Sequence, residues 1–179
     1  MQLENILLNE NVISYTYQHL KELLKIIPEL KLTINFNQHH PHHHLTVFNH
    51  TLLAISFAPK DYTLRLTLLL HDIGKVYSFV EKDGVRHYPN HAEISSQIAR
   101  NILVRLGYDL EYINIVCELI KWHDTKINEQ DIKENYDFYY MLYQIQYCDA
   151  LSHHPLKLEN RVSYLNELKK IIEEYKHTR

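Results

Sequence analysis

The chain has 179 residues, of which 45% are hydrophobic and 23% charged, and its formal net charge is −3. This length suffices for one domain, residues 1–179, that buries roughly 70% of the surface exposed by the unfolded chain. Three glycines and five prolines are too few for a disordered chain or a loop-built β protein. The slightly negative charge excludes the global positive field that would hold a long nucleic-acid duplex.

Hydrophobic periodicity predicts two helices in the first third of the chain. Apolar residues recur at near-helical spacing over residues 11–27, and Pro28 ends the pattern. Residues 33–44 then break the pattern, because this stretch contains another proline and five histidines. Helical spacing resumes over residues 45–58, so a long loop is expected between the two helices.

A third helix and a hairpin are predicted next. Asp61 is a good N-cap for a helix that runs through a leucine-rich stretch and stops near Gly74. Further along, Asp83-Gly84 is the strongest hairpin turn signal of the chain, because β-type residues flank it on both sides. We therefore expect one small hairpin or extended loop near residues 77–88.

The second half of the chain has the pattern of a helical bundle. Helical spacing returns over about residues 90–107, 109–124, 136–151 and 159–175, and Asn90 is predicted to cap the first of these helices. No internal repeat and no Gly/Ser-rich linker divides the chain. We therefore predict an all-α fold, a single helical bundle that carries one small hairpin.

The N-terminus and the cysteines indicate the cellular compartment of the protein. Its N-terminus carries acidic residues and lacks the basic region and apolar run of a secretory signal. No apolar stretch approaches the ~20 residues needed to cross a bilayer. Cys117 and Cys148 stand far apart without CxxC spacing, which is typical of a reduced compartment. A soluble, cytoplasmic protein without a membrane partner is expected.

Six polar residues interrupt otherwise apolar helical stretches, where an unpartnered polar group costs several kcal/mol. They are His50, His71, Asp72, His91, His123 and Asp149. His71 and Asp72 are expected in the last turn of the third helix. A single buried histidine is more often a hydrogen-bonded core residue than a ligand, but six such placements together favour a divalent metal. Mixed imidazole and carboxylate donors suit iron, manganese, cobalt, nickel or zinc better than calcium or magnesium, with magnesium kept as an alternative.

These residues, in this order, resemble the HD-domain metal-dependent phosphohydrolases over about residues 35–155. The superfamily pattern H…HD…D matches four of the six, and His91 and His123 stand where binuclear members carry two further histidines. The resemblance implies two divalent ions. It also implies that Asp72 bridges them, that His91 and His123 hold one ion, and that the other ion is held by His50, His71 and Asp149.

Two segments resemble, more specifically, the HD domains appended to bacterial tRNA nucleotidyltransferases. In "NQHHPHHHLTVFNHT", Pro41 and His43 match that family, while His42 replaces the usual tyrosine. In "DGVRHYPNHAEISSQIA", His91 matches and Asn90 stands where glycine is usual. The sequence shows no nucleotidyltransferase head, so we expect the HD module to stand alone.

The resemblance implies a metal-dependent phosphohydrolase that acts by metal-activated water on a small phosphoester. The expected substrate is a 2',3'-cyclic nucleotide, another nucleotide or a short nucleic-acid end, and long duplexes are not expected. The alternative is a catalytically silent regulatory module that binds metal and nucleotide. Turnover of any phosphodiester in the presence of manganese would distinguish the two.

Three further residues are candidates for substrate contact. Lys75 follows the HD pair and is assigned, with Asp72, to catalysis as well as to phosphate binding; a helix-end lysine that complements the dipole is the alternative. His43 is a candidate contact or a surface residue. Arg86 follows the hairpin turn, where it either lines the site or is an exposed charge. Asp124, beside His123, is expected to orient an imidazole.

Overall fold

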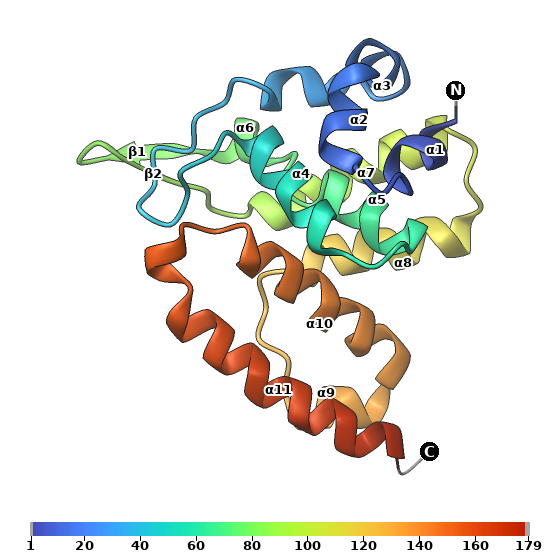
Figure 1. Ribbon diagram of the computed structural model, residues 1–179, viewed down its shortest axis with the longest axis vertical. Helices are drawn as coiled ribbons and strands as arrows, with labels where there is room; N and C mark the ends of the chain where they lie inside the picture. The colour runs from blue at the N-terminus through green and yellow to red at the C-terminus, as the bar shows by residue number, and fades with distance from the viewer. Residues whose placement is uncertain (1, 178–179) are drawn as a thin grey trace.

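The computed structural model describes residues 2–177, apart from the side chains of Lys157, Asn160 and His177. This part of the chain is mostly helical and has one two-stranded antiparallel hairpin, which confirms the predicted fold class (Figure 1). None of the described helices is long and apolar enough to cross a membrane.

The elements follow one another along the chain with short connections. The α-helices are α1 (Leu3–Leu7), α2 (Val12–Gln18), α3 (Leu20–Ile26), α4 (Val47–Phe57), α5 (Tyr62–Leu70), α6 (Lys75–Ser78), α7 (His91–Arg105), α8 (Leu110–Trp122), α9 (Glu129–Glu134), α10 (Tyr136–Leu151) and α11 (Glu159–His177). Two 3₁₀ helices, η1 (Pro28–Thr33) and η2 (Pro155–Lys157), and the strands β1 (Val80–Lys82) and β2 (Val85–His87) complete the described part.

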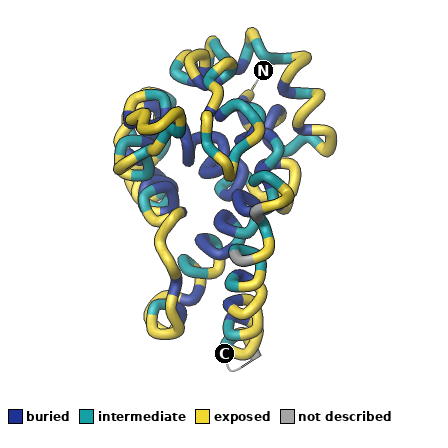
Figure 2. Tube along the Cα trace, turned by 90° about the vertical axis from the view of Figure 1, so that its left-hand side faces the viewer, coloured by how far each residue is buried: buried dark blue, intermediate teal, exposed yellow. Residues whose placement is uncertain are grey.

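The helices form two packed groups (Figure 1). In the upper group, α4 packs on α5, α5 on α8, and α7 on α8, while α10 and α11 pair below and α10 contacts α4, α5 and α8. Figure 2 shows buried residues along the inner sides of these helices and exposed residues outside. On α11 the buried residues Leu165, Leu168 and Ile172 are three and four apart, the spacing of a single apolar face.

Helix α5 occupies the centre of the core. All residues from Leu64 to Leu70 are buried, as in a helix that is covered on every side. Asp61 caps its start as predicted, and its side chain accepts a hydrogen bond from the Leu64 N–H at 2.9 Å. The helix ends at Leu70, so His71 and Asp72 lie in the turn that follows and not in the last helical turn.

Arg65 of α5 is a buried charge whose partners are main-chain carbonyls. Its guanidinium donates to the oxygen of Leu7 at 2.6 Å, of Ala58 at 2.9 Å and of Asn9 at 3.1 Å, and Nε donates to the oxygen of Pro59 at 2.9 Å. These carbonyls lie at and just beyond the ends of α1 and α4, where helices leave such acceptors unsatisfied. One side chain therefore fastens two helix ends to the central helix.

The structure corrects two further predictions for the helices. The helix expected over residues 11–27 breaks at His19, whose backbone (φ −112°, ψ 24°) separates α2 from α3. Neither proline nor glycine marks this break, so the periodicity did not reveal it. Asn90 precedes α7, but its side chain makes no capping hydrogen bond, and its backbone is left-handed at φ 57°. A left-handed conformation favours glycine or asparagine, which accounts for the residue type at this position.

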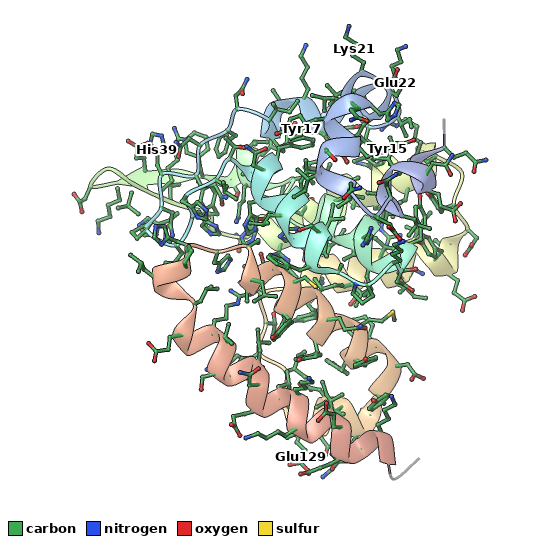
Figure 3. All side chains as sticks on the ribbon, in the orientation of Figure 1. Tyr15, Tyr17, Lys21, Glu22, His39 and Glu129 are labelled. Atoms are coloured by element: carbon green, nitrogen blue, oxygen red, sulfur yellow. The ribbon has the colours of Figure 1, made fainter. Side chains whose placement is uncertain are left out.

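The hairpin and the histidine-rich loop lie together at one end of the molecule. The predicted turn at Asp83-Gly84 is confirmed, with both residues at positive φ. In Figure 3 the loop that carries His39 lies beside the hairpin, and the Arg86 N–H donates to the His39 carbonyl at 2.9 Å. The loop is thereby held next to the elements that build the site described below.

Candidate metal centre

Three helices bring four of the predicted residues into one buried cluster. His50 lies on α4, His71 and Asp72 follow α5, and Asp149 lies near the end of α10. His50 Nε2 is 2.9 Å from Asp149 Oδ1 and 3.3 Å from Asp72 Oδ2. His71 Nε2 is 3.3 Å from Asp72 Oδ2 and 3.4 Å from Asp149 Oδ1. We call these four residues the first cluster.

The second cluster adjoins the first and shares Asp72 with it. It consists of Asp72, His91 at the start of α7 and His123 just after α8. His91 Nε2 lies 3.3 Å from His123 Nε2 and 3.4 Å from Asp72 Oδ1, and His123 Nε2 lies 3.8 Å from the same oxygen. Asp72 thus presents Oδ2 to the first cluster and Oδ1 to the second. The structure brings all six predicted residues together.

The outer nitrogen of each histidine has its own partner in the protein. In three of the four, Nδ1 faces the main-chain carbonyl three residues earlier: Leu68 for His71 (2.7 Å), Tyr88 for His91 (3.0 Å) and Ile120 for His123 (2.6 Å). For His50, Nδ1 lies 2.9 Å from Ser152 Oγ. A carbonyl oxygen can only accept a hydrogen bond, so Nδ1 must carry the proton that is donated to it. The Nε2 lone pair of the same ring is then directed into the clusters.

Buried polar atoms in the clusters lack hydrogen bonds. Asp72 Oδ1 and His71 Nε2 are in this state, and Asp72 Oδ2 has ion-pair contacts only, with Lys75 Nζ at 2.7 Å and with His50 Nε2 at 3.3 Å. Donor atoms 2.0 to 2.2 Å from one ion lie about 3 to 3.5 Å from each other at tetrahedral to octahedral angles, and the distances in the two clusters, 2.9 to 3.8 Å, are close to this range. The donor set therefore fits divalent metal ions, with imidazole nitrogens and carboxylate oxygens as ligands.

The electrostatics of the clusters keep the carboxylates ionised. Burial alone would raise the pKa of Asp72, but the charges of His71 and Lys75 hold it well below its usual value. The pKa of Asp149 is likewise lowered against the effect of burial, mainly by His153 and His50. Burial opposes a charge on His50, yet Asp149 and Asp72 raise its pKa to about 9.

A cavity of about 700 Å³ opens over both clusters. Its wall includes His43 from the histidine-rich loop, Lys75 from α6, Tyr88 beyond the hairpin and Arg161 from α11. Two main-chain hydrogen bonds hold the loop in place, one to the hairpin and one in which the His154 N–H donates to the carbonyl of His42 at 2.8 Å. The cavity is therefore enclosed by segments from both helical groups.

The candidate substrate residues differ in where they lie. Lys75 is buried at the start of α6, with Nζ 2.7 Å from Asp72 Oδ2 and 3.0 Å from Gln38 Oε1, so it is not a solvated lysine at a helix end. His43 lines the cavity, and its ring packs edge-on against His50 and His153. Its Nδ1 is buried without a hydrogen bond.

Arg86 lies outside the cavity lining formed by the described residues. Its guanidinium packs over the rings of Phe36 and Phe79, at 5.1 and 4.7 Å from their centroids, and donates to the carbonyl of Asn37 at 2.7 Å. This geometry gives Arg86 a structural position between the loop and the hairpin. It does not support the predicted substrate contact.

Three residues around the centre were not predicted as part of it. Arg161 Nη2 lies 3.1 Å from Asp149 Oδ2, His153 Nε2 lies 3.5 Å from the same oxygen, and Gln38 accepts the hydrogen bond of Lys75. His153 follows the ligand candidate Asp149 by four residues, a spacing that would have placed both on one helix face. Arg161 and Gln38 lack any such signal, because only the fold brings them near the clusters.

Gly74 allows α7 to approach the turn that carries Asp72. A Cβ at this position would lie 2.6 Å from both His91 O and Ser95 N, and the Gly74 N–H donates to Ser95 Oγ at 2.8 Å. Two of the closest atoms belong to the backbone, so the helix itself would have to move. The position of His91 relative to Asp72 depends on this contact.

Gly74→Ala is therefore expected to lower the free energy of unfolding by about 1 to 3 kcal/mol, as overpacking does, and to weaken metal binding at the second cluster. Urea unfolding and metal titration measure the two effects. Gly84→Ala is the matched control, because its left-handed backbone (φ 73°) is strained by any side chain while the space around it is open. Equal metal binding by Gly74→Ala and Gly84→Ala would contradict the role of the close contact.

The chain is similar in sequence to known proteins over most of its length. The family model of the HD domain matches residues 16–171 of the chain. The chain is also 32% identical over 113 residues to a CC-adding tRNA nucleotidyltransferase of Thermus thermophilus. That match covers 58% of this chain and 25% of the relative, so the chain spans about a quarter of the relative's length. The family match extends over most of the chain, and the protein belongs to the HD domain family.

Proposed function

We propose that the protein is a metal-dependent phosphohydrolase that uses two divalent ions to hydrolyse a small phosphoester. The observation that carries this proposal is the pair of clusters that share Asp72 at the base of one cavity. When bound, two such ions supply a nucleophile at neutral pH and neutralise charge on the phosphoryl oxygens. Iron, manganese, cobalt, nickel or zinc suits the donor set, and magnesium is an alternative.

The side chains around the clusters have separate tasks in this proposal. Lys75 contacts a phosphate oxygen or protonates the leaving oxygen, and Gln38 keeps its ammonium group beside Asp72. His43 presents its ring to the substrate from the cavity wall. The four histidines of the clusters, oriented through their outer nitrogens, would hold the ions.

A nucleotide-sized phosphodiester is the proposed substrate, with a 2',3'-cyclic nucleotide as the first choice and a short nucleic-acid end as another. A cavity of about 700 Å³ lies within the range that accommodates such ligands. The similarity to the nucleotidyltransferase of Thermus thermophilus points to nucleotide chemistry. The net charge of −3 disfavours long duplexes.

A substrate panel tests this function. Metal-free protein is loaded with manganese, cobalt or iron and assayed with 2',3'-cyclic nucleotides, nucleotides, bis(p-nitrophenyl) phosphate and long RNA and DNA. We expect turnover of the small phosphodiesters and its loss on chelation. Cleavage restricted to long polymers would contradict the substrate class. Binding of nucleotide without turnover of any compound would instead indicate a regulatory module.

The second cluster gives a prediction on metal content. His91→Ala removes one of its three donors and is expected to lower the metal content from near two ions per chain towards one. Elemental analysis after metal loading and gel filtration measures this content. His44→Ala is the control, because His44 is exposed and packs against His154 away from the clusters. A His91→Ala protein with the same two ions as wild type would contradict the assignment of His91.

A further inference from the structure

Asp124 lies beside His91 and His123 but is not one of the six residues that form the two clusters. We infer that Asp124 is a ligand of the second ion, so that each ion is held by two histidines, the shared Asp72 and one carboxylate of its own. The inference rests on the proposed two-ion centre. It adds a seventh donor residue and makes the two metal subsites alike in composition.

Asp124 faces the Nε2 atoms of both histidine rings in the second cluster, which is the first argument. Asp124 Oδ2 lies 3.1 Å from Nε2 of His91 and 3.7 Å from Nε2 of His123. These are the inner nitrogens, because the outer nitrogens face the carbonyls of Tyr88 and Ile120. A carboxylate that only orients an imidazole binds its outer nitrogen. Asp124 therefore lies on the ligand side of both rings, and its expected orienting role is replaced by a ligand role.

The second argument is the spacing of the donor atoms. The distance from Asp124 Oδ2 to His91 Nε2 equals the spacing of two donors around one ion, about 3 to 3.5 Å. The distances of His91 Nε2 from His123 and Asp72, 3.3 and 3.4 Å, are of the same size. Asp124 also lines the cavity above the clusters. Donor atoms of Asp72, His123 and Asp124 thus each lie one coordination spacing, 3.1 to 3.4 Å, from His91 Nε2.

The third argument is that Arg161 holds Asp124 and Asp149 in the same manner. Its Nη2 lies 3.1 Å from Asp149 Oδ2 and 3.4 Å from Asp124 Oδ1. The other oxygen of Asp149 faces His50 and that of Asp124 faces His91. Each carboxylate therefore gives one oxygen to Arg161 and directs the other to a histidine of its own cluster. An outer partner of this kind orients a ligating carboxylate.

A His-Asp pair follows the end of a helix at both clusters. His71-Asp72 follows the end of α5, and His123-Asp124 follows the end of α8. In each pair the histidine turns its outer nitrogen to the carbonyl three residues earlier, in the last turn of the helix. The aspartate that comes next is thereby carried to the metal side of the ring. The two HD pairs thus supply both clusters from equivalent helix ends.

Metal titration of the whole chain tests the inference. Metal-free wild type, Asp124→Ala and Asp124→Asn are titrated with Co²⁺, and the visible absorption and the bound metal are followed for each equivalent. We expect both variants to bind the first ion normally and the second about tenfold or more weakly, with an altered spectrum of the second ion. Glu93→Gln is the matched control, because Glu93 pairs with Lys121 outside the cavity. Near-UV circular dichroism confirms that each variant is folded.

The inference is overturned if Asp124→Ala takes up both ions with the affinity and spectrum of wild type, or if wild type binds one ion only. Phosphodiester turnover is assayed separately on the same samples. A wild-type protein that binds two ions through Asp124 but hydrolyses no phosphodiester contradicts the proposed function and leaves the ligand role of Asp124 intact. The two failures are therefore distinguishable.

Discussion

Asp72→Ala is expected to lower turnover by about a thousandfold or more, the effect of losing a metal-generated nucleophile. Asp72 is the one residue that faces both clusters, with Oδ2 towards His50 and His71 and Oδ1 towards His91. In the proposed two-ion centre, its removal would deprive both ions of a ligand at once. Metal analysis of the same purified variant is expected to show fewer than two ions, and circular dichroism shows whether it is folded.

Two further variants separate the metal effect from other effects of the substitution. The Asp72 carboxylate also neutralises the buried Lys75, so Asp72→Ala leaves an unpaired buried charge that destabilises the protein. Asp72→Asn keeps the shape of the side chain and is expected to show the same loss of metal and turnover. Lys75→Ala is expected to retain both ions and to lose turnover only. A folded Asp72→Asn protein with two ions and normal turnover would refute the shared-ligand role.

Arg65→Ala is expected to lower the free energy of unfolding by about 3 kcal/mol or more. The substitution removes a charged donor from four carbonyls, and unsatisfied buried acceptors cost about 1 to 3 kcal/mol each. The carbonyls of Leu7 and Ala58 are the buried ones, so most of the loss arises at the ends of α1 and α4. Urea unfolding followed by circular dichroism measures the effect.

Arg105→Ala is the matched control for this measurement. Arg105 is half exposed and pairs with Glu29 at 2.9 Å on the surface, so its removal is expected to cost less than about 1 kcal/mol. Arg65→Lys keeps the charge but not the planar fork, and is expected to fall between the two. Equal unfolding midpoints for Arg65→Ala and Arg105→Ala would show that Arg65 does not fasten the helix ends.

The parts of the fold that were predicted correctly have strong local signals. The hairpin follows from Asp83-Gly84, whose backbone angles few other residue pairs adopt. Helix α10 begins and ends where the pattern placed it, at Tyr136 and Leu151. The break at His19 has no such signal. Only the backbone of His19 changes there, and the apolar spacing continues from α2 into α3.

The six cluster residues were recognisable because they are polar in stretches that must be buried. A buried polar side chain needs a partner, and the apolar stretch around it shows in the sequence that it will be buried. Arg161 and Gln38 stand in polar surroundings, so nothing in the sequence distinguishes them from surface residues. Arg86 was left with two alternatives, the site or an exposed position, because a charge after a hairpin turn does not reveal its direction. Its guanidinium lies on Phe36 and Phe79 and not in the cavity.

In the proposed centre, one carboxylate, Asp72, joins two metal subsites. The most direct measurement is the electron paramagnetic resonance spectrum of wild-type protein loaded with two equivalents of Mn²⁺. Two ions that share the Asp72 carboxylate are expected to give the multiline spectrum of an exchange-coupled pair, which Asp72→Asn abolishes. A spectrum of isolated, uncoupled Mn²⁺ at full loading would contradict the account.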